Sequence, residues 1–175
     1  MRLLAEIDHT PGIPHTGRTV TREAVRAIIL EGSQLLMIHA TCRGDYKFPG
    51  GGIKKGEGHF LALTREVNEE SGAHIRKLTG VFGLVVEYDR PIEKRYDLFK
   101  MISYYYRVGI EPTFGIQHLD NYEYELGFTP EWIRVEEAIA INQTLLREQP
   151  SHVQRWVRRE TTVLEIIKNE LLGSR

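Results

Sequence analysis

The stretch that decides the fold is residues 50–73, which read GGGIKKGEGHFLALTREVNEESGA. Three successive glycines are followed, after a short polar link, by a helical repeat of apolar residues over 59–71. Gly72 stands where a helix can end through a positive φ. The pattern predicts a glycine loop that leads into a helix, whose buried face carries Phe60, Leu63 and Val67.

This helix carries an unusual group of acids. Glu66, Glu69 and Glu70 are spaced i, i+3 and i+4, so at 3.6 residues per turn they lie within about a 100° arc. Like charges at this spacing destabilise a helix by about 0.2 to 0.5 kcal/mol per pair, and acids near its C-terminal end oppose the helix dipole. Arg65 offsets part of the charge. Because carboxylate oxygens are hard ligands, we expect Mg²⁺ or Mn²⁺ at this edge.

The same stretch resembles a known family signature. Gly51, Glu57 and the run Arg65-Glu66-Val67-Asn68-Glu69-Glu70-Ser71-Gly72 fit the box GX5EX7REUXEEXGU of the Nudix hydrolases, in which U is aliphatic. The box covers Gly51 to Ala73, and Ala73 is the one departure because it is smaller than the usual aliphatic residue there. The resemblance implies an α/β fold, an α/β/α sandwich with a mixed sheet between helices.

The resemblance also implies an activity. Members of the family hydrolyse a nucleoside diphosphate linked to another group, with Mg²⁺ or Mn²⁺ as cofactor and water attacking a phosphorus of the phosphoanhydride. A small-molecule nucleotide is therefore the expected substrate. We favour a nucleoside triphosphate or a related nucleotide, because the chain is short enough for one compact domain.

Roles follow by position in the box. Glu69 and Glu70 are implied to be direct metal ligands, and Glu66 is implied to be a further ligand or the base that orients water. The carbonyl of Gly50 is similar to a backbone ligand seen in the family. The three glutamates are accordingly the expected catalytic residues.

Other residues are expected to support these ligands or to bind substrate. Glu57 and Arg65 would order the loop and the acidic helix through hydrogen bonds and ion pairing. Gly51 and Gly52 would let backbone run close to phosphate oxygens. Arg43 is a candidate for gripping a substrate phosphate, although an exposed loop arginine is equally compatible with simple solvation.

An acidic segment lies further along the chain, over 115–129. In the family this part of the chain often supplies another metal ligand or a base. The candidates here are Asp120, Glu123 and Glu125.

Composition limits the function classes. With 175 residues, 41% apolar and 27% charged, the chain is expected to form a single soluble globular domain over 1–175. Its 23 basic and 24 acidic residues create no overall field for polymeric nucleic acid. No apolar run approaches the roughly 20 residues that span a bilayer, and no signal peptide is recognisable, so we expect a cytoplasmic protein without a membrane partner.

The remaining secondary structure is expected from local patterns. An irregular segment is expected at about 8–22, and strands at 3–7, 24–30, 34–40, 78–88 and 98–108. The strands 24–30 and 34–40 are expected to form a hairpin, and the last two strands should also pair.

Two further helices are expected, at 135–146 and 152–172. The last helix should begin with a capping box from Ser151 and Gln154 and end at Gly173 in a left-handed cap. Its apolar stripe is expected to pack on the sheet, and a homodimer interface is the alternative.

Two alternative functions belong to other classes. A Nudix-fold binding or regulatory module would bind a nucleotide without turnover, but the complete set of box residues speaks against it. The isomerase chemistry related to this family normally uses a reactive cysteine and a modified box. Cys42 is the only thiol in the chain, and the box is unmodified.

Overall fold

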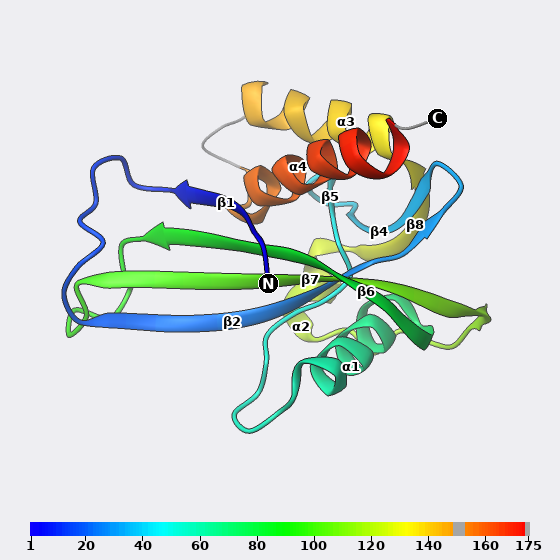
Figure 1. Ribbon diagram of the computed structural model, residues 1–175, viewed down its shortest axis with the longest axis horizontal. Coiled ribbons are helices and arrows are strands. Elements are labelled where there is room, and N and C mark those ends of the chain that lie inside the picture. The colour runs from blue at the N-terminus through cyan, green and yellow to red at the C-terminus, as the bar shows by residue number, and fades with distance from the viewer. Residues whose placement is uncertain (149–152, 174–175) are drawn as a thin grey trace.

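The computed structural model describes residues 1–148 and 153–173 of the chain. Two β-sheets lie between helices (Figure 1): α1 (His59–Ser71) covers one side, and α3 (Val135–Glu148) and α4 (Trp156–Ile167) pack together on the other. This arrangement confirms the expected α/β/α sandwich.

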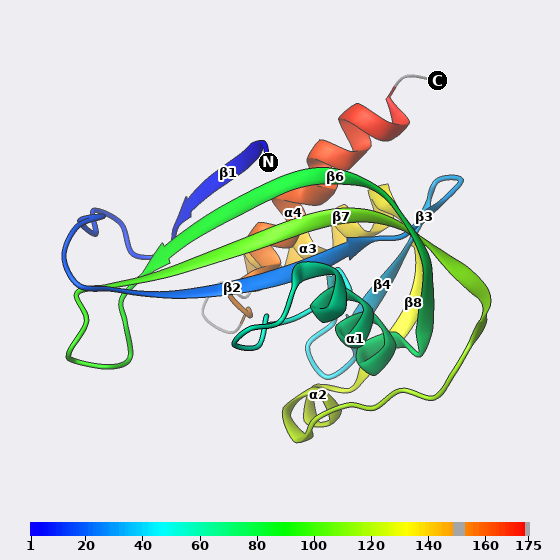
Figure 2. The same ribbon diagram turned by 60° about the horizontal axis from the view of Figure 1, so that its bottom comes forward.

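The larger sheet is mixed, also as expected. Its strand order is β1-β6-β7-β2, where β1 pairs with β6 and β2 with β7 in parallel, and β6 and β7 are antiparallel. The strands are β1 (Leu3–Asp8), β2 (Thr19–Ile28), β6 (Ala73–Asp89) and β7 (Leu98–Phe114). The register between β6 and β7 shifts at four places, and these irregularities accompany the bend of both long strands in Figure 2.

A smaller antiparallel sheet corrects one prediction. It contains β3 (Leu30–Glu31), β4 (Gln34–Ala40), β5 (Asp45–Lys47) and β8 (Phe128–Arg134). The expected hairpin between 24–30 and 34–40 is wrong in extent, because only β3 pairs with the start of β4 while residues 24–28 pair with β7 in the other sheet. Residues 24–28 are buried on both strand faces, a pattern that suits an interior strand better than a two-stranded hairpin.

The other strand predictions hold with changed bounds. β1 matches the strand expected at 3–7. The pair expected at 78–88 and 98–108 is present but extends further, over 73–89 and 98–114. The irregular segment expected at 8–22 is shorter, because β2 already begins at Thr19 and residues 19–22 pair with 98–101 of β7.

Helix α1 has the expected bounds and ends at Gly72, whose φ is +70°. Leu63 and Val67 are buried as expected, together with Ala62. Phe60 is 49% exposed, so its assignment to the buried face is wrong; it belongs to the first turn of the helix, which the neighbouring strands do not cover.

The last helix differs from its prediction at both ends. It starts at Trp156, and a π-helical segment continues it over Lys168–Leu172. Gly173 has a φ of −74°, so the expected left-handed cap is wrong: the backbone stays right-handed through the π-helical turn. Ser151, the first residue of the expected capping box, lies outside the described residues.

The apolar stripe of α4 packs in the core as expected. Val157, Val163 and Ile167 have no measurable exposure. Val163 and Ile167 join a core cluster that also contains Ile7 of β1 and Tyr105 of β7. Helix α3 confirms the helix expected at 135–146. Within the described part of the chain, no helix combines the length and the apolar character that crossing a membrane requires.

A buried ionic cluster attaches α4 to the larger sheet. Arg159 of α4 donates hydrogen bonds to Glu87 of β6 and to the neighbouring Glu160, both at 2.6 Å. All three residues are at least 96% buried. Burial alone would raise the pKa of Glu87, but the charge of Arg159 and a hydrogen bond to His9 outweigh it and lower the pKa to about 2.

Replacing Arg159 should therefore destabilise the folded protein. Arg159→Leu removes the hydrogen-bonded cation of two buried carboxylates and should lower the free energy of unfolding by about 3 to 5 kcal/mol. Arg158→Leu, at the exposed neighbouring position, should change it by about 0.5 kcal/mol or less. Urea denaturation of the two variants measures the difference, and equal midpoints would contradict this role of the cluster.

Candidate functional site

The glycine loop runs along the free edge of β2. The backbone N–H of Val25 donates to the carbonyl of Gly51 at 3.0 Å, and that of Ala27 donates to Pro49 at 2.8 Å. Gly50 has a φ of +138°, and a Cβ at this position would lie 2.1 Å from the carbonyl oxygen of Val25. Only glycine fits there, and the loop is held close to the sheet as a result.

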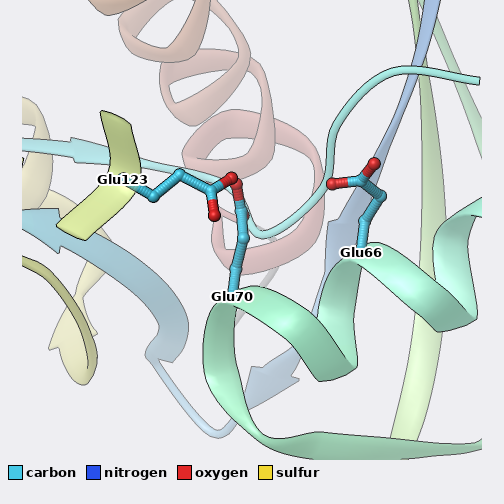
Figure 3. Close-up of side chains that lie close together, drawn as sticks. All are labelled: Glu66, Glu70 and Glu123. Carbon is cyan, nitrogen blue, oxygen red and sulfur yellow. The ribbon is translucent and has the colours of Figure 1, made fainter. Parts of the chain in front are cut away.

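Three glutamates from two separate segments come together beside this loop. Glu66 and Glu70 of α1 and Glu123 of α2 (Asn121–Leu126) each place a carboxylate oxygen within 4.8 Å of the others. In Figure 3 the carboxylates of Glu70 and Glu123 point toward each other, and Glu66 lies one turn away on α1. The structure thus unites two acids of the box with one of the three candidates from the acidic segment.

Local hydrogen bonds orient Glu123. The side chain of Asp120 accepts from the N–H of Glu123 at 2.8 Å, and the carboxylate of Glu123 accepts from the N–H of Asp120 at 2.9 Å, which completes a capping box. Burial raises the pKa of Glu123 to about 7, and the charges of Glu70 and Asp120 add to the effect. Glu125 is exposed and lies outside the acidic group.

Glu69 lies apart from this group and forms an ion pair with Arg65. Its carboxylate is 37% exposed and accepts from the guanidinium at 3.0 Å. The same guanidinium donates to Glu66 at 2.5 Å and to both oxygens of Glu57 at 2.8 Å. Hydrogen bonds from the guanidinium of Arg65 and from the backbone N–H of Lys54 lower the pKa of Glu57 to about 2. One arginine therefore holds three carboxylates of the box.

A buried lysine that the sequence reasoning missed contacts the group from the other side. The ammonium of Lys47, which is 4% exposed, bonds to the carboxylate of Glu70 and lies 3.4 Å from the carbonyl of Gly50. Burial lowers the pKa of Lys47, and the charge of Glu70 opposes that shift. One feature of the sequence could have indicated this buried lysine: it stands directly before Phe48, in the mainly apolar segment that precedes the three glycines.

Arg26 of β2 is the second missed residue. It is 7% exposed, its guanidinium donates to the carbonyl of Gly50, and it lies 4.0 Å from Glu160 of α4. The carbonyl expected to bind metal thus accepts from two cationic side chains. No local pattern could have indicated this contact, because it joins residues that are 24 positions apart.

The three residues expected to bind substrate have different surroundings in the structure; they are Gly51, Gly52 and Arg43. A Cβ at Gly51 would lie 2.2 Å from an oxygen of Glu66, whereas a Cβ at Gly52 would have nothing within 4 Å. The carbonyl of Gly52 accepts from Arg65 at 3.1 Å. Arg43 is exposed in the turn after β4, and within the described residues its side chain makes no hydrogen bond or ion pair.

The donor set fits a hard divalent cation. Three carboxylates supply oxygen atoms, and the lack of a side chain at Gly51 lets the carboxylate of Glu66 lie directly against the loop. Lys47 and Arg65 supply positive charge around the same carboxylates. The two side chains limit the repulsion among the carboxylates, while the carboxylates themselves supply the negative charge that a cation beside the glycine loop requires.

Comparison with protein families decides the assignment, because a model of the NUDIX domain matches residues 20–157. The chain belongs to the Nudix family. The match extends well beyond the box, from β2 to the start of α4.

Solved Nudix structures share the fold. A NUDIX hydrolase from Nitrosomonas europaea is 19% identical, with a TM-score of 0.57 over 89% of this chain and 92% of that one. A MutT NUDIX hydrolase from Burkholderia pseudomallei is 17% identical, with a TM-score of 0.53 over 83% and 97%. A C. elegans Ap4A hydrolase is 19% identical, with a TM-score of 0.52 over 87% and 98%. Comparison with curated proteins gave no match.

The bonds of Arg65 lead to a prediction about the loop. Arg65→Ala removes the donors that hold Glu57, whose carboxylate in turn accepts from the N–H of Lys54 at 2.9 Å. Amide hydrogen exchange at Lys54 should therefore accelerate by about tenfold or more, as local opening becomes easier. In Arg76→Ala, which removes an exposed arginine of β6, the rate at Lys54 should stay the same. Equal rates in both variants would contradict the ordering role.

Proposed function

We propose that this Nudix protein hydrolyses the phosphoanhydride of a nucleoside diphosphate linked to another group, with Mg²⁺ or Mn²⁺ as cofactor. The observation that carries the proposal is the meeting of Glu66, Glu70 and Glu123 beside the glycine loop. A nucleoside triphosphate or a related nucleotide remains the favoured substrate. The same proposal treats residues 1–175 as one working domain, since the main core cluster joins Ile7 near one end to Ile167 near the other.

The proposed ligands are the carboxylates of α1 and α2 with the carbonyl of Gly50. Glu70 and Glu123 would hold the cation, and Glu66 would be a further ligand or the base that orients water. Glu69 stays in the proposed set because it projects from the same helix, and its binding would require release from Arg65. When bound, the cation would neutralise charge on phosphate oxygens and lower the pKa of a water molecule.

Other residues of the chain would position the substrate. Gly51 and Gly52 leave backbone accessible to phosphate oxygens, and Arg65 with Glu57 fixes the loop relative to α1. Arg43 is the proposed arginine for a substrate phosphate, since a guanidinium can bind two of its oxygens at once. These contacts hold the reacting phosphorus in place, which is the main contribution a protein makes to this chemistry.

A nucleotide panel distinguishes this proposal from a binding module without turnover. The full chain is incubated with nucleoside triphosphates, nucleotide sugars and dinucleoside polyphosphates in Mg²⁺ or Mn²⁺, and product masses are identified. A nucleoside monophosphate with its partner product supports hydrolysis and shows which phosphorus was attacked. A raised melting temperature without any product would favour the binding module.

Removing one carboxylate of the acidic group should abolish most turnover. Glu70→Gln and Glu123→Gln should each lower kcat by about two orders of magnitude or more, as loss of a charge-stabilising group does. Glu123→Gln should disturb the fold less than Glu70→Gln, because Glu70 is ion-paired with the buried Lys47 and Glu123 is not. Glu125→Gln, on the exposed side of the same helix, should turn over normally. Normal kcat in Glu123→Gln would exclude its role.

The glycine loop provides a second matched pair. Gly51→Ala would push the carboxylate of Glu66 away, whereas Gly52→Ala adds a methyl group to open space. Mn²⁺ affinity, measured by electron paramagnetic resonance, should fall by about tenfold or more in Gly51→Ala, the expected cost of disturbing a ligand. Gly52→Ala should bind Mn²⁺ as the native chain does. Equal affinities would show that Glu66 does not help to hold the cation.

A further inference from the structure

Two adjoining cavities lie on the face of the larger sheet that α4 covers only in part. The ends of β2, β6 and β7 extend beyond the helices at the left of Figure 1. An inner cavity of about 240 Å³ and an outer cavity of about 130 Å³ both have Phe99 and Arg155 in their walls. The two cavities therefore adjoin at these residues, and together they are called the trough.

The trough borders the glycine loop at both ends. Its inner wall contains Arg26, whose guanidinium donates to the carbonyl of Gly50. Its outer wall contains Arg22, which also lines a further cavity of about 430 Å³ over Gly52 and Glu57. The backbone N–H of Gly50 in turn donates to Glu70 at 2.9 Å, so the wall of the trough and the acidic group meet at the same loop residue.

The outer cavity is strongly cationic. Arg22 comes from β2, Arg90 directly follows β6, and Arg155 directly precedes α4. Within the described residues, the guanidinium groups of Arg22 and Arg90 form no ion pair with a carboxylate within 4.0 Å. The one acid in the wall, Glu93, is paired with Arg95 at 2.8 Å and so is already compensated. Two guanidinium groups remain available for an anion from outside.

A buried acid organises two of these arginines. Asp89 is 4% exposed, and its carboxylate accepts from the backbone N–H of Arg90 at 2.7 Å and from the hydroxyl of Thr10 at 2.9 Å. The same carboxylate is ion-paired with the guanidinium of Arg155. The segments that carry Arg90 and Arg155 are therefore fixed relative to each other, which lowers the entropy lost when they bind a common ligand.

The rest of the wall is apolar. Val20, Ile92 and Phe99 line the outer cavity with the arginines, and Ile92 is 98% exposed. The apolar wall that Val20 and Phe99 form suits the carbon atoms of a ligand better than a bare hydrated ion. The lining thus combines guanidinium groups for an anion with contact area for the carbon atoms that carry it.

We propose that Arg22, Arg90 and Arg155 bind a phosphate monoester at the far end of the substrate, beyond the bond that is cleaved. The inference rests on the proposed function and narrows its substrate class. The group linked to the nucleoside diphosphate carries a phosphate of its own. Guanidinium groups suit this ligand, since each can donate two parallel hydrogen bonds to phosphate oxygens.

The test is calorimetric titration of the full chain in EDTA, with phenyl phosphate and inorganic phosphate as probes. Phenyl phosphate should bind more tightly than inorganic phosphate, because its ring contacts the apolar wall. The double variant Arg22→Ala, Arg90→Ala should weaken phenyl phosphate by about tenfold or more, the usual cost of losing a hydrogen bond to a charged group. The control Arg76→Ala, Arg134→Ala removes the same charge from other exposed strand positions and should bind normally.

Three results would overturn the proposal: no binding of phenyl phosphate by the native chain, an equal loss in the control, or unchanged binding in the Arg22, Arg90 variant. Equal affinity for both probes would assign the site to free phosphate instead of a phosphate carried by substrate. The titration involves neither metal nor turnover. A chain that binds phenyl phosphate but releases no product from any nucleotide would therefore defeat the proposed function alone.

Discussion

Mutual repulsion of carboxylates at the end of α1 is the constraint on which the rest of the site depends. Two unit charges 4 Å apart repel by about 4 kcal/mol at the effective dielectric constant near a protein surface. The structure meets this cost with fixed cations, Lys47 at Glu70 and Arg65 at Glu66. The acids are thereby kept close together beside the glycine loop.

The fold supplies this arrangement through contacts that reach across the molecule. Burial of Arg159 with Glu160 places α4 firmly on the larger sheet, and Glu160 also lies beside Arg26. Arg26 in turn holds the carbonyl of Gly50. The position of the glycine loop thus depends on the C-terminal helix as well as on the box, so a change in the core beneath α4 would reach the acidic group.

The sequence predicted what local spacing determines. The bounds of α1 and its end at Gly72 follow from a short repeat, and both are present. Of the predicted acidic edge, Glu66 and Glu70 come together, whereas Glu69 lies apart on Arg65. Long-range pairing was harder to predict: the turn at 31–33 was recognised, but its preceding strand joined another sheet. For the same reason Glu123 was one of three equal candidates, and only the placement of α2 against α1 selects it. The contact between Lys47 and Glu70 likewise joins segments that no local pattern relates.

The central claim is that the acids of α1 and α2 form one binding site for a hard dication. Crystals soaked in Mn²⁺ test it most directly, because anomalous scattering locates the ion independently of any activity. The account predicts an anomalous peak bounded by the carboxylates of Glu66, Glu70 and Glu123, near the carbonyl of Gly50. A fully soaked crystal with no peak there, or with its strongest peak at other residues, would contradict it.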